Sequence, residues 1–167
     1  LHAAGLQSGA VRPSHRGRGL YRDVMQAALD HCDAKGFEAV ALLTESPGLY
    51  ERHGFRTLPQ HRFSGPPPED GHACPVRRLH IQSDDDVTLL CRLLDGRKPV
   101  SDRFSPMRQR EMFLFNALLM PDVKLDLLEE GDVVVAWRLD EHGRFELLDI
   151  VGASIPSLAD ILASLGI

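Results

Sequence analysis

The sequence lacks the features that would assign its 167 residues to several large classes of protein. No apolar run approaches the roughly 20 residues of a transmembrane helix, and no signal peptide is visible. The three cysteines, Cys32, Cys74 and Cys91, show no CxxC spacing, which indicates reduced, structural thiols. We therefore expect a cytoplasmic protein with no membrane partner.

An excess of basic residues is also absent. The chain has 19 Lys and Arg residues against 24 Asp and Glu residues, which gives a net charge of −5. Contact with a phosphate backbone requires a basic face, so we expect no nucleic-acid partner. Against this acidic background, the cluster of Arg12, Arg16, Arg18 and Arg22 indicates a local anion site, with a solvated basic turn as the alternative.

Hydrolase and metal-dependent motifs are missing as well. No Ser stands in G-x-S-x-G, the nucleophile elbow of many hydrolases. The eight histidines contain no H-E-x-x-H pattern, so zinc is not expected. Three aspartates at 84–86 follow Ser83 at a predicted helix start, where carboxylates interact favourably with the helix dipole. We therefore expect no bound metal.

The most informative segment that is present runs over residues 11–21 and contains a Gly-Arg-Gly loop. It predicts a strand end, a turn and a helix start, an arrangement that directs backbone N–H groups at an anion. Gly17 and Gly19 allow close approach, and Arg16 and Arg18 add positive charge. The loop lacks the Lys-Ser/Thr of a nucleotide-triphosphate loop, and Arg22 replaces the third glycine of a dinucleotide fingerprint.

A second motif follows at residues 46–55. Ser46 and a following proline predict a helix start, Gly54 predicts its end, and Phe55 is expected to begin a new strand. Between the motifs, the spacing predicts a helix over 20–35 and a buried strand over 37–44, hence a parallel strand–helix–strand unit. The expected buried face of the helix comprises Leu20, Val24, Ala27, Ala28 and Cys32.

The two motifs together resemble the GNAT acyltransferase superfamily, whose loop has the pattern Q/R-x-x-G-x-G/A. Arg16 and Gly19 match this pattern, whereas Tyr21 stands where Gly or Ala is usual. The resemblance implies that acetyl-CoA is the cosubstrate and that Tyr50, four residues before Gly54, is the general acid for the departing thiolate. It implies the following cofactor-binding residues: Ala10, Val11, Arg16, Gly17, Arg18, Gly19, Leu20, Tyr21 and Ser46.

The implied reaction is transfer of an acetyl group to an amine of a small molecule or a peptide. The backbone around Ala10 and Val11, expected on a central strand over 5–11, would hold the pantetheine arm and polarise the thioester carbonyl. Glu45 is the nearest candidate for the general base, acting through water. The alternative is a non-catalytic GNAT-like protein that binds acyl-CoA or serves as a structural repeat. A second copy of the chain is a further candidate partner.

The domain organisation follows from composition and from the same resemblance. We expect an α/β (α+β) fold, a mixed sheet flanked by helices. Residues 1–64 resemble the C-terminal half of a GNAT domain, and 65–73 form a linker rich in Pro and Gly. Residues 74–167 resemble, by topology alone, the N-terminal half of a second, degenerate repeat. Because the chain opens on Leu1, we expect a fragment of a tandem-GNAT protein; a permuted single domain stays open.

Within residues 74–167, hydrophobic periodicity and turn residues predict seven elements. Helices are expected after Ser83, over 106–119 with an apolar Met/Phe stripe in the core, and over 158–165. The four strands are expected over 76–81, 124–129, 133–139 and 144–151, and the last three form an antiparallel meander.

Overall fold

The computed structural model describes residues 1–102, 104–107 and 109–167. The chain divides into two compact units, Leu1–Phe63 and Ser64–Ile167, and each contains helices and a sheet. The predicted mixed α/β class is therefore confirmed. Among the described residues, no helix combines the length and the apolar character needed to cross a lipid bilayer.

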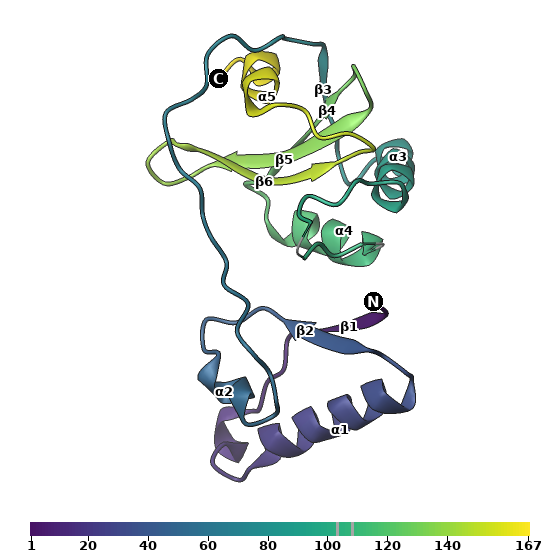
Figure 1. Ribbon diagram of the computed structural model, residues 1–167, viewed down its shortest axis with the longest axis vertical. Helices are drawn as coiled ribbons and strands as arrows, with labels where there is room; N and C mark the ends of the chain where they lie inside the picture. The colour runs from purple at the N-terminus through teal and green to yellow at the C-terminus, as the bar shows by residue number, and fades with distance from the viewer. Residues whose placement is uncertain (103, 108) are drawn as a thin grey trace. The chain divides into compact units, whose positions relative to one another are not determined.

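The first unit is a strand–helix–strand arrangement (Figure 1). Strand β1 (Ala3–Leu6) pairs in parallel with β2 (Ala39–Leu42), and helix α1 (Leu20–Ala34) connects them, as the sequence predicts. A 3-10 turn η1 (Pro13–His15) precedes α1, and the short helix α2 (Gly48–Glu51) follows β2. Gly54, with φ of +86°, ends this helical segment as expected.

Two strand predictions in this unit differ from the structure. The strand expected over 5–11 lies earlier and ends at Leu6, because Ser8 takes a left-handed φ of 57° that interrupts extended backbone. The strand expected to begin at Phe55 is wrong, since residues 55–63 form no strand. A strand exists only by pairing with a neighbour, and apolar composition alone does not supply that neighbour.

The buried face of α1 is rotated from the predicted one. Ala28 and Cys32 are covered as expected, but Leu20 and Val24 are 38% and 58% exposed. The covered residues instead follow an overlapping helical stripe: Tyr21, Met25, Ala28, Leu29 and Cys32. Both stripes have spacings of three and four, so hydrophobic periodicity alone does not show which one is buried. The buried stripe contains the larger Tyr and Met side chains.

The second unit is built on a four-stranded antiparallel sheet in the order β3-β4-β5-β6. This order confirms the predicted meander. The strands are β3 (Val76–Arg78), β4 (Lys124–Leu128), β5 (Val133–Leu139) and β6 (Phe145–Val151). The helices are α3 (Asp84–Asp95), α4 (Arg110–Leu119) and α5 (Leu158–Leu165). Ser83 caps α3 and Ser157 caps α5, each by accepting a hydrogen bond from the backbone N–H three residues later.

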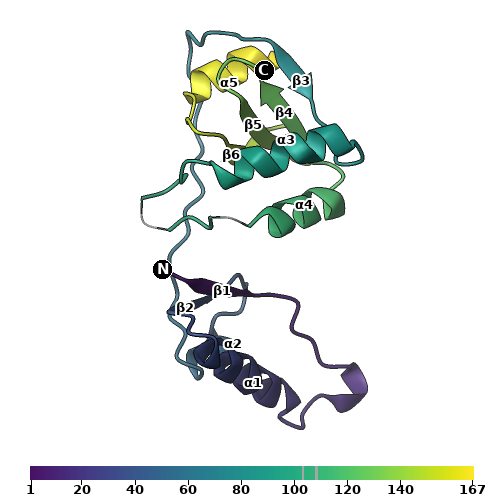
Figure 2. The same cartoon turned by 90° about the vertical axis from the view of Figure 1, so that its right-hand side faces the viewer.

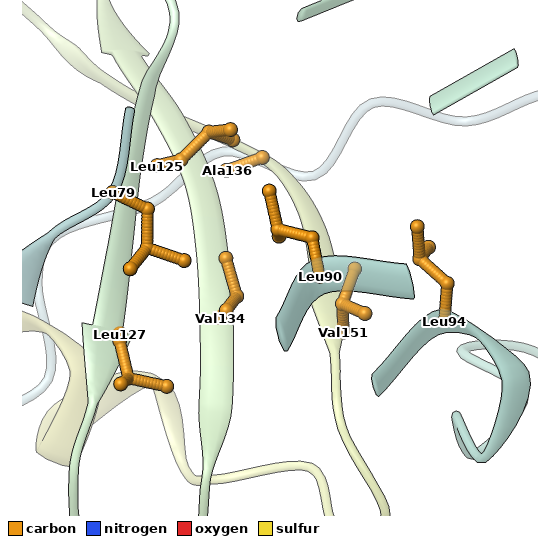
Figure 3. Packing of buried hydrophobic residues seen from close by; sticks show 8 residues of the cluster. All are labelled: Leu79, Leu90, Leu94, Leu125, Leu127, Val134, Ala136 and Val151. Carbon is orange, nitrogen blue, oxygen red and sulfur yellow. The ribbon is translucent and has the colours of Figure 1, made fainter. Parts of the chain in front are cut away.

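Alternation along the strands sends side chains to two cores on opposite faces of the sheet. On one face, Leu127 and Val134 pack with Leu90 and Leu94 of α3 (Figure 3). On the other, Val135 packs with Ile161 of α5 and other members of a smaller cluster. Figure 2 shows α3 and α5 on the two sides of the sheet. The unit is therefore a three-layer arrangement of helix, sheet and helix.

Helix α4 corrects two details of the predicted helix over 106–119. It begins at Arg110, and residue 108 of the predicted first turn lies outside the described residues. Phe113 packs against the core of the α3 face, whereas Leu118 and Leu119 are each 60% exposed. The predicted Met/Phe stripe is thus only partly core.

Candidate functional site

The Gly-Arg-Gly loop, the start of α1 and the end of α2 surround a hollow of about 190 Å³. The side chains and backbone around it come from both sequence motifs, residues 11–21 and 46–55. The lining residues are Val11, His15, Arg16, Gly17, Gly19, Leu20, Tyr21, Arg22, Leu49, Arg52 and His53. The parallel pairing of β1 and β2 brings them together, because both motifs follow the carboxyl ends of these neighbouring strands.

The loop leaves a run of backbone N–H groups without a partner in the first unit. Gly17 and Gly19 both have φ of +78°, a left-handed geometry in which a side chain is strained. Within the first unit, five consecutive N–H groups from the loop into the first turn of α1 find no acceptor in the protein: Gly17, Arg18, Gly19, Leu20 and Tyr21. These groups, at the positive end of the α1 dipole, can bind an anion.

Positive side chains surround the same hollow. Arg16 and Arg22 come from the loop and α1, and Arg52 comes from the end of α2. Arg16 also fixes the loop, since its Nε donates to the carbonyl oxygen of Val11 at 3.2 Å. The Arg22 guanidinium lies 3.5 Å from the Asp23 carboxylate, and both are exposed. Because an exposed pair of this kind is weak, Arg22 stays available to a stronger anion.

A pair of tyrosines lies beside the hollow. The hydroxyl oxygens of Tyr21, on α1, and Tyr50, on α2, are 3.0 Å apart, and the rings meet edge to face with centroids 6.3 Å apart. Tyr50 makes a second edge-to-face contact with Phe55 at 5.9 Å. The hydrogen bond to Tyr50, with a smaller effect of burial, raises the pKa of Tyr21 to about 12. Tyr21 therefore keeps its proton at pH values where a free phenol ionises.

Gly9 fits against the Tyr21 ring. A Cβ atom at this glycine would lie 2.9 Å from the Tyr21 hydroxyl oxygen and 3.0 Å from its Cε2. Such contacts are closer than packed atoms allow, so the absence of a side chain at position 9 leaves room for the ring. Three separate segments, around Gly9, Tyr21 and Tyr50, thus fix one hydroxyl pair.

The structure brings most of the predicted loop residues to the hollow. Val11, Arg16, Gly17, Gly19, Leu20 and Tyr21 line it, and Tyr50 adjoins it through Tyr21. Ala10, Arg18 and Ser46 are not among the lining residues. The Ser46 side chain does not cap α2, because the helix begins at Gly48; the Ser46 N–H instead donates to the Thr44 hydroxyl at 3.0 Å.

The predicted general base, Glu45, does not reach the hollow, and Ala10 and Val11 do not lie on a strand. Glu45 is exposed, follows β2, and makes no contact with the hollow. Ala10 and Val11 lie in irregular backbone, four and five residues beyond the end of β1. The Val11 carbonyl is already bonded to Arg16.

Sequence reasoning missed Arg52, His53 and Leu49 as neighbours of the loop. They occupy positions i, i+3 and i+4 around the short helix α2, which places them on one side of it. That spacing was visible in the sequence once Tyr50 was taken as a helix residue. The contact between Gly9 and Tyr21 had no sequence signal, because it depends on how irregular backbone approaches a ring.

Comparison with known families identifies the first unit. Residues 1–58 match the family model of the acetyltransferase (GNAT) domain. The matched segment contains both motifs and the helix and strand between them. A comparison with curated proteins found no match to this chain. Among the described residues, no group of three or more His, Cys, Asp or Glu side chains is arranged to hold a metal ion.

Proposed function

Because residues 1–58 belong to the GNAT family, whose domains transfer acyl groups from acyl-CoA, we propose that this chain binds acetyl-CoA and transfers its acetyl group to an amine. The observation that carries the proposal is the run of five N–H groups over residues 17–21 that find no acceptor in the first unit, four of which belong to residues lining the hollow. A pyrophosphate offers oxygens to several such groups at once, and the guanidinium groups of Arg16, Arg22 and Arg52 would add charge-assisted bonds.

The proposed reaction is direct transfer. The amine nitrogen attacks the thioester carbonyl carbon, the C–S bond breaks, and the sulfur receives a proton from the Tyr50 hydroxyl. The amine loses one proton as the amide forms, which balances the proton that the thiol gains. Glu45 would take the amine proton through water, since it makes no direct contact with the hollow. The acceptor would be a small molecule or a peptide.

Binding of acetyl-CoA is tested with Arg16→Ala, matched by Arg12→Ala in the same loop, which does not line the hollow. A saturating ligand at ~100-fold over its Kd stabilises the native state by about 2.7 kcal/mol, visible as a rise in Tm. We expect Arg16→Ala to weaken binding about tenfold or more, the range for a charge-assisted hydrogen bond, and Arg12→Ala to weaken it much less. Equal loss in both variants would indicate a diffuse charge effect.

Chemistry at Tyr50 is tested separately from binding. The assay follows CoA thiol release from acetyl-CoA with a mixture of a diamine, an amino acid and a short peptide. We expect Tyr50→Phe to lower kcat by about 100-fold, the usual contribution of a general acid, with the Kd of acetyl-CoA nearly unchanged. Binding without any acceptor-dependent release in the native chain would favour the non-catalytic alternative.

We propose that residues 74–167 act as a GNAT-like half-domain that does not bind CoA. The order β3-α3-α4-β4-β5-β6-α5, with its antiparallel meander, supports this assignment. The segment before α5, residues 152–157, lacks the Arg-x-x-Gly pattern of the first loop. In an amide NMR titration of the full chain with acetyl-CoA, we expect shifts within residues 1–63 alone. Saturable shifts around residues 152–158 would contradict the assignment.

A further inference from the structure

The tyrosine beside Tyr50 has no role in the reaction as set out above. Tyr21 is the second residue of α1 and lines the hollow, while its hydroxyl oxygen lies 3.0 Å from that of Tyr50. Both side chains are half-buried. A half-buried phenol that gives up its proton leaves a charged oxygen with little water around it, which is costly unless a donor faces it.

We propose that Tyr21 is a positioning residue for Tyr50: its hydroxyl donates a hydrogen bond to the Tyr50 oxygen, holds it toward the sulfur, and stabilises the phenolate formed when the sulfur is protonated. The inference rests on the proposed function, because it assigns the pair to departure of the CoA thiolate. This role leaves the proton balance of the reaction unchanged. Tyr50 loses its proton to sulfur and regains one derived from the amine, while Tyr21 keeps its own.

The packing around the pair fits this role. Gly9 holds the Tyr21 ring on one side, with space for no Cβ atom, and Phe55 contacts the Tyr50 ring edge to face. Each ring thus has few alternative rotamers, so the two hydroxyls stay in register. Because the two hydroxyl oxygens are 3.0 Å apart, Tyr21 can donate to the Tyr50 oxygen when Tyr50 gives up its proton.

Tyr21 is also well placed to influence binding and chemistry differently. Its backbone N–H is one of the five that find no acceptor in the first unit, whereas its hydroxyl contacts that of Tyr50. The substitution Tyr21→Phe keeps the backbone and the ring and removes only the hydroxyl. It therefore separates the proposed donor from the anion site to which the same residue contributes.

The first measurement uses the fact that the chain contains two tyrosines. With tyrosine labelled by carbon-13 at Cζ, NMR follows each phenol through a pH titration, and Tyr50→Phe leaves Tyr21 as the sole signal. We expect the pKa of Tyr21 to fall from about 12 toward the ordinary value of 10 in Tyr50→Phe. A titration of Tyr21 that is the same in the native chain and in Tyr50→Phe overturns the inference.

The second measurement is a double-mutant cycle on kcat, in the CoA-release assay with the amine mixture. Tyr21→Phe should lower kcat at least about tenfold, as expected for losing a hydrogen bond to a charged group, with little change in the Kd of acetyl-CoA. If Tyr21 acts through Tyr50, the Tyr21→Phe/Tyr50→Phe double variant has the kcat of Tyr50→Phe alone. Multiplying effects indicate a general structural role and overturn the inference.

A further variant displaces the hydroxyl without removing it. Gly9→Ala forces the Tyr21 ring away and should reproduce the kcat defect, whereas Gly48→Ala, which meets no atom within 4 Å, is the matched glycine control. Native kcat in Gly9→Ala overturns the inference. A chain that fails to bind acetyl-CoA overturns the proposed function together with this role. If the chain binds acetyl-CoA and turns over, but the effects of Tyr21→Phe and Tyr50→Phe on kcat multiply, the role of Tyr21 is overturned and the proposed function stands.

Discussion

At the scale of single residues, Asp126 holds a buried polar network in the second unit. Its carboxylate is 3% exposed and accepts hydrogen bonds from the Arg78 guanidinium at 2.6 and 3.0 Å and from Trp137 Nε1 at 2.7 Å. Lys124 Nζ lies over the Trp137 ring, 4.4 Å from its centroid. The sequence shows only an aspartate in an apolar strand, which by itself conflicts with burial; the three donors resolve the conflict.

We predict that Asp126→Asn destabilises the second unit by about 2 kcal/mol. The asparagine NH2 group faces donors from Arg78 and Trp137, and at least one of these loses its acceptor while buried. Urea unfolding followed by the fluorescence of Trp137, the single tryptophan, measures the change. Asp122→Asn is the control, since its bond to Arg138 is exposed and should contribute less than ~1 kcal/mol. Equal effects would contradict the network.

Residue-scale prediction from the sequence succeeded where a residue type has one strong local use. Gly54 ends its helical segment with a positive φ, and Ser83 caps its helix. It failed where the partner is distant in the chain. The contact between Gly9 and Tyr21 is predicted by no hydrophobic periodicity, charge pattern or capping rule. Only the packed structure supplies that information.

At the scale of elements, the segment after the Pro/Gly stretch is attached to α5. The His72 N–H donates to the Asp160 carboxylate at 2.8 Å, and the Cys74 N–H donates to the Ser164 hydroxyl at 3.1 Å. Gly71 lies so close to the helix that a Cβ atom there would be 2.0 Å from the Ala159 carbonyl oxygen. Residues 71–74 therefore pack against α5.

We predict that Gly71→Ala detaches this segment and destabilises the second unit by about 1–3 kcal/mol, the range for overpacking against backbone that cannot yield. Gly65→Ala, in the same stretch with no atom within 4 Å of its Cβ position, should change the unfolding free energy by less than ~0.5 kcal/mol. Urea unfolding compares the two. Hydrogen exchange locates the destabilisation: the amides of α5 should lose protection in Gly71→Ala and keep it in Gly65→Ala.

Element prediction was most accurate where two independent signals agree. The limits of β5 and α5 match the predicted 133–139 and 158–165, because turn or capping residues bound their apolar patterns. It was least accurate for α1 and α4. Their hydrophobic residues exceed what one face can bury, so the packing partner decides which are covered, and the sequence of a single helix does not contain that partner.

At the scale of the whole molecule, burial is unequal between the two units. In the first, Met25 and Cys32 are the buried hydrophobic side chains of the described residues, while the second has two packed clusters on its sheet. The candidate site therefore lies in the unit with the smaller core. The carboxyl groups whose pKa is lowered, in contrast, lie in the second unit.

Three of these carboxyl groups have a pKa below the ordinary value of 3.8. The Arg77 guanidinium at 2.6 Å, and then the His80 N–H, lower the pKa of Asp86. The Arg144 N–H lowers the pKa of Asp140 to about 2. The Ser157 hydroxyl, and then the His72 N–H, lower the pKa of Asp160. Each carboxylate thus binds protons more weakly in the folded state than in the unfolded state.

We predict that the second unit loses stability as the pH falls from about 4 toward about 2. The unfolded state takes up protons first, so the stabilisation is complete above the unfolded pKa and disappears as the folded groups protonate. Urea unfolding of the native chain and of Asp86→Asn, followed by Trp137 fluorescence, tests this at a series of pH values. The native chain should be the more stable at pH 6, and the difference should shrink toward pH 2 because protonated Asp86 accepts from Arg77 as weakly as asparagine does. A difference that stays constant over this range would assign the role of Asp86 to packing and not to charge.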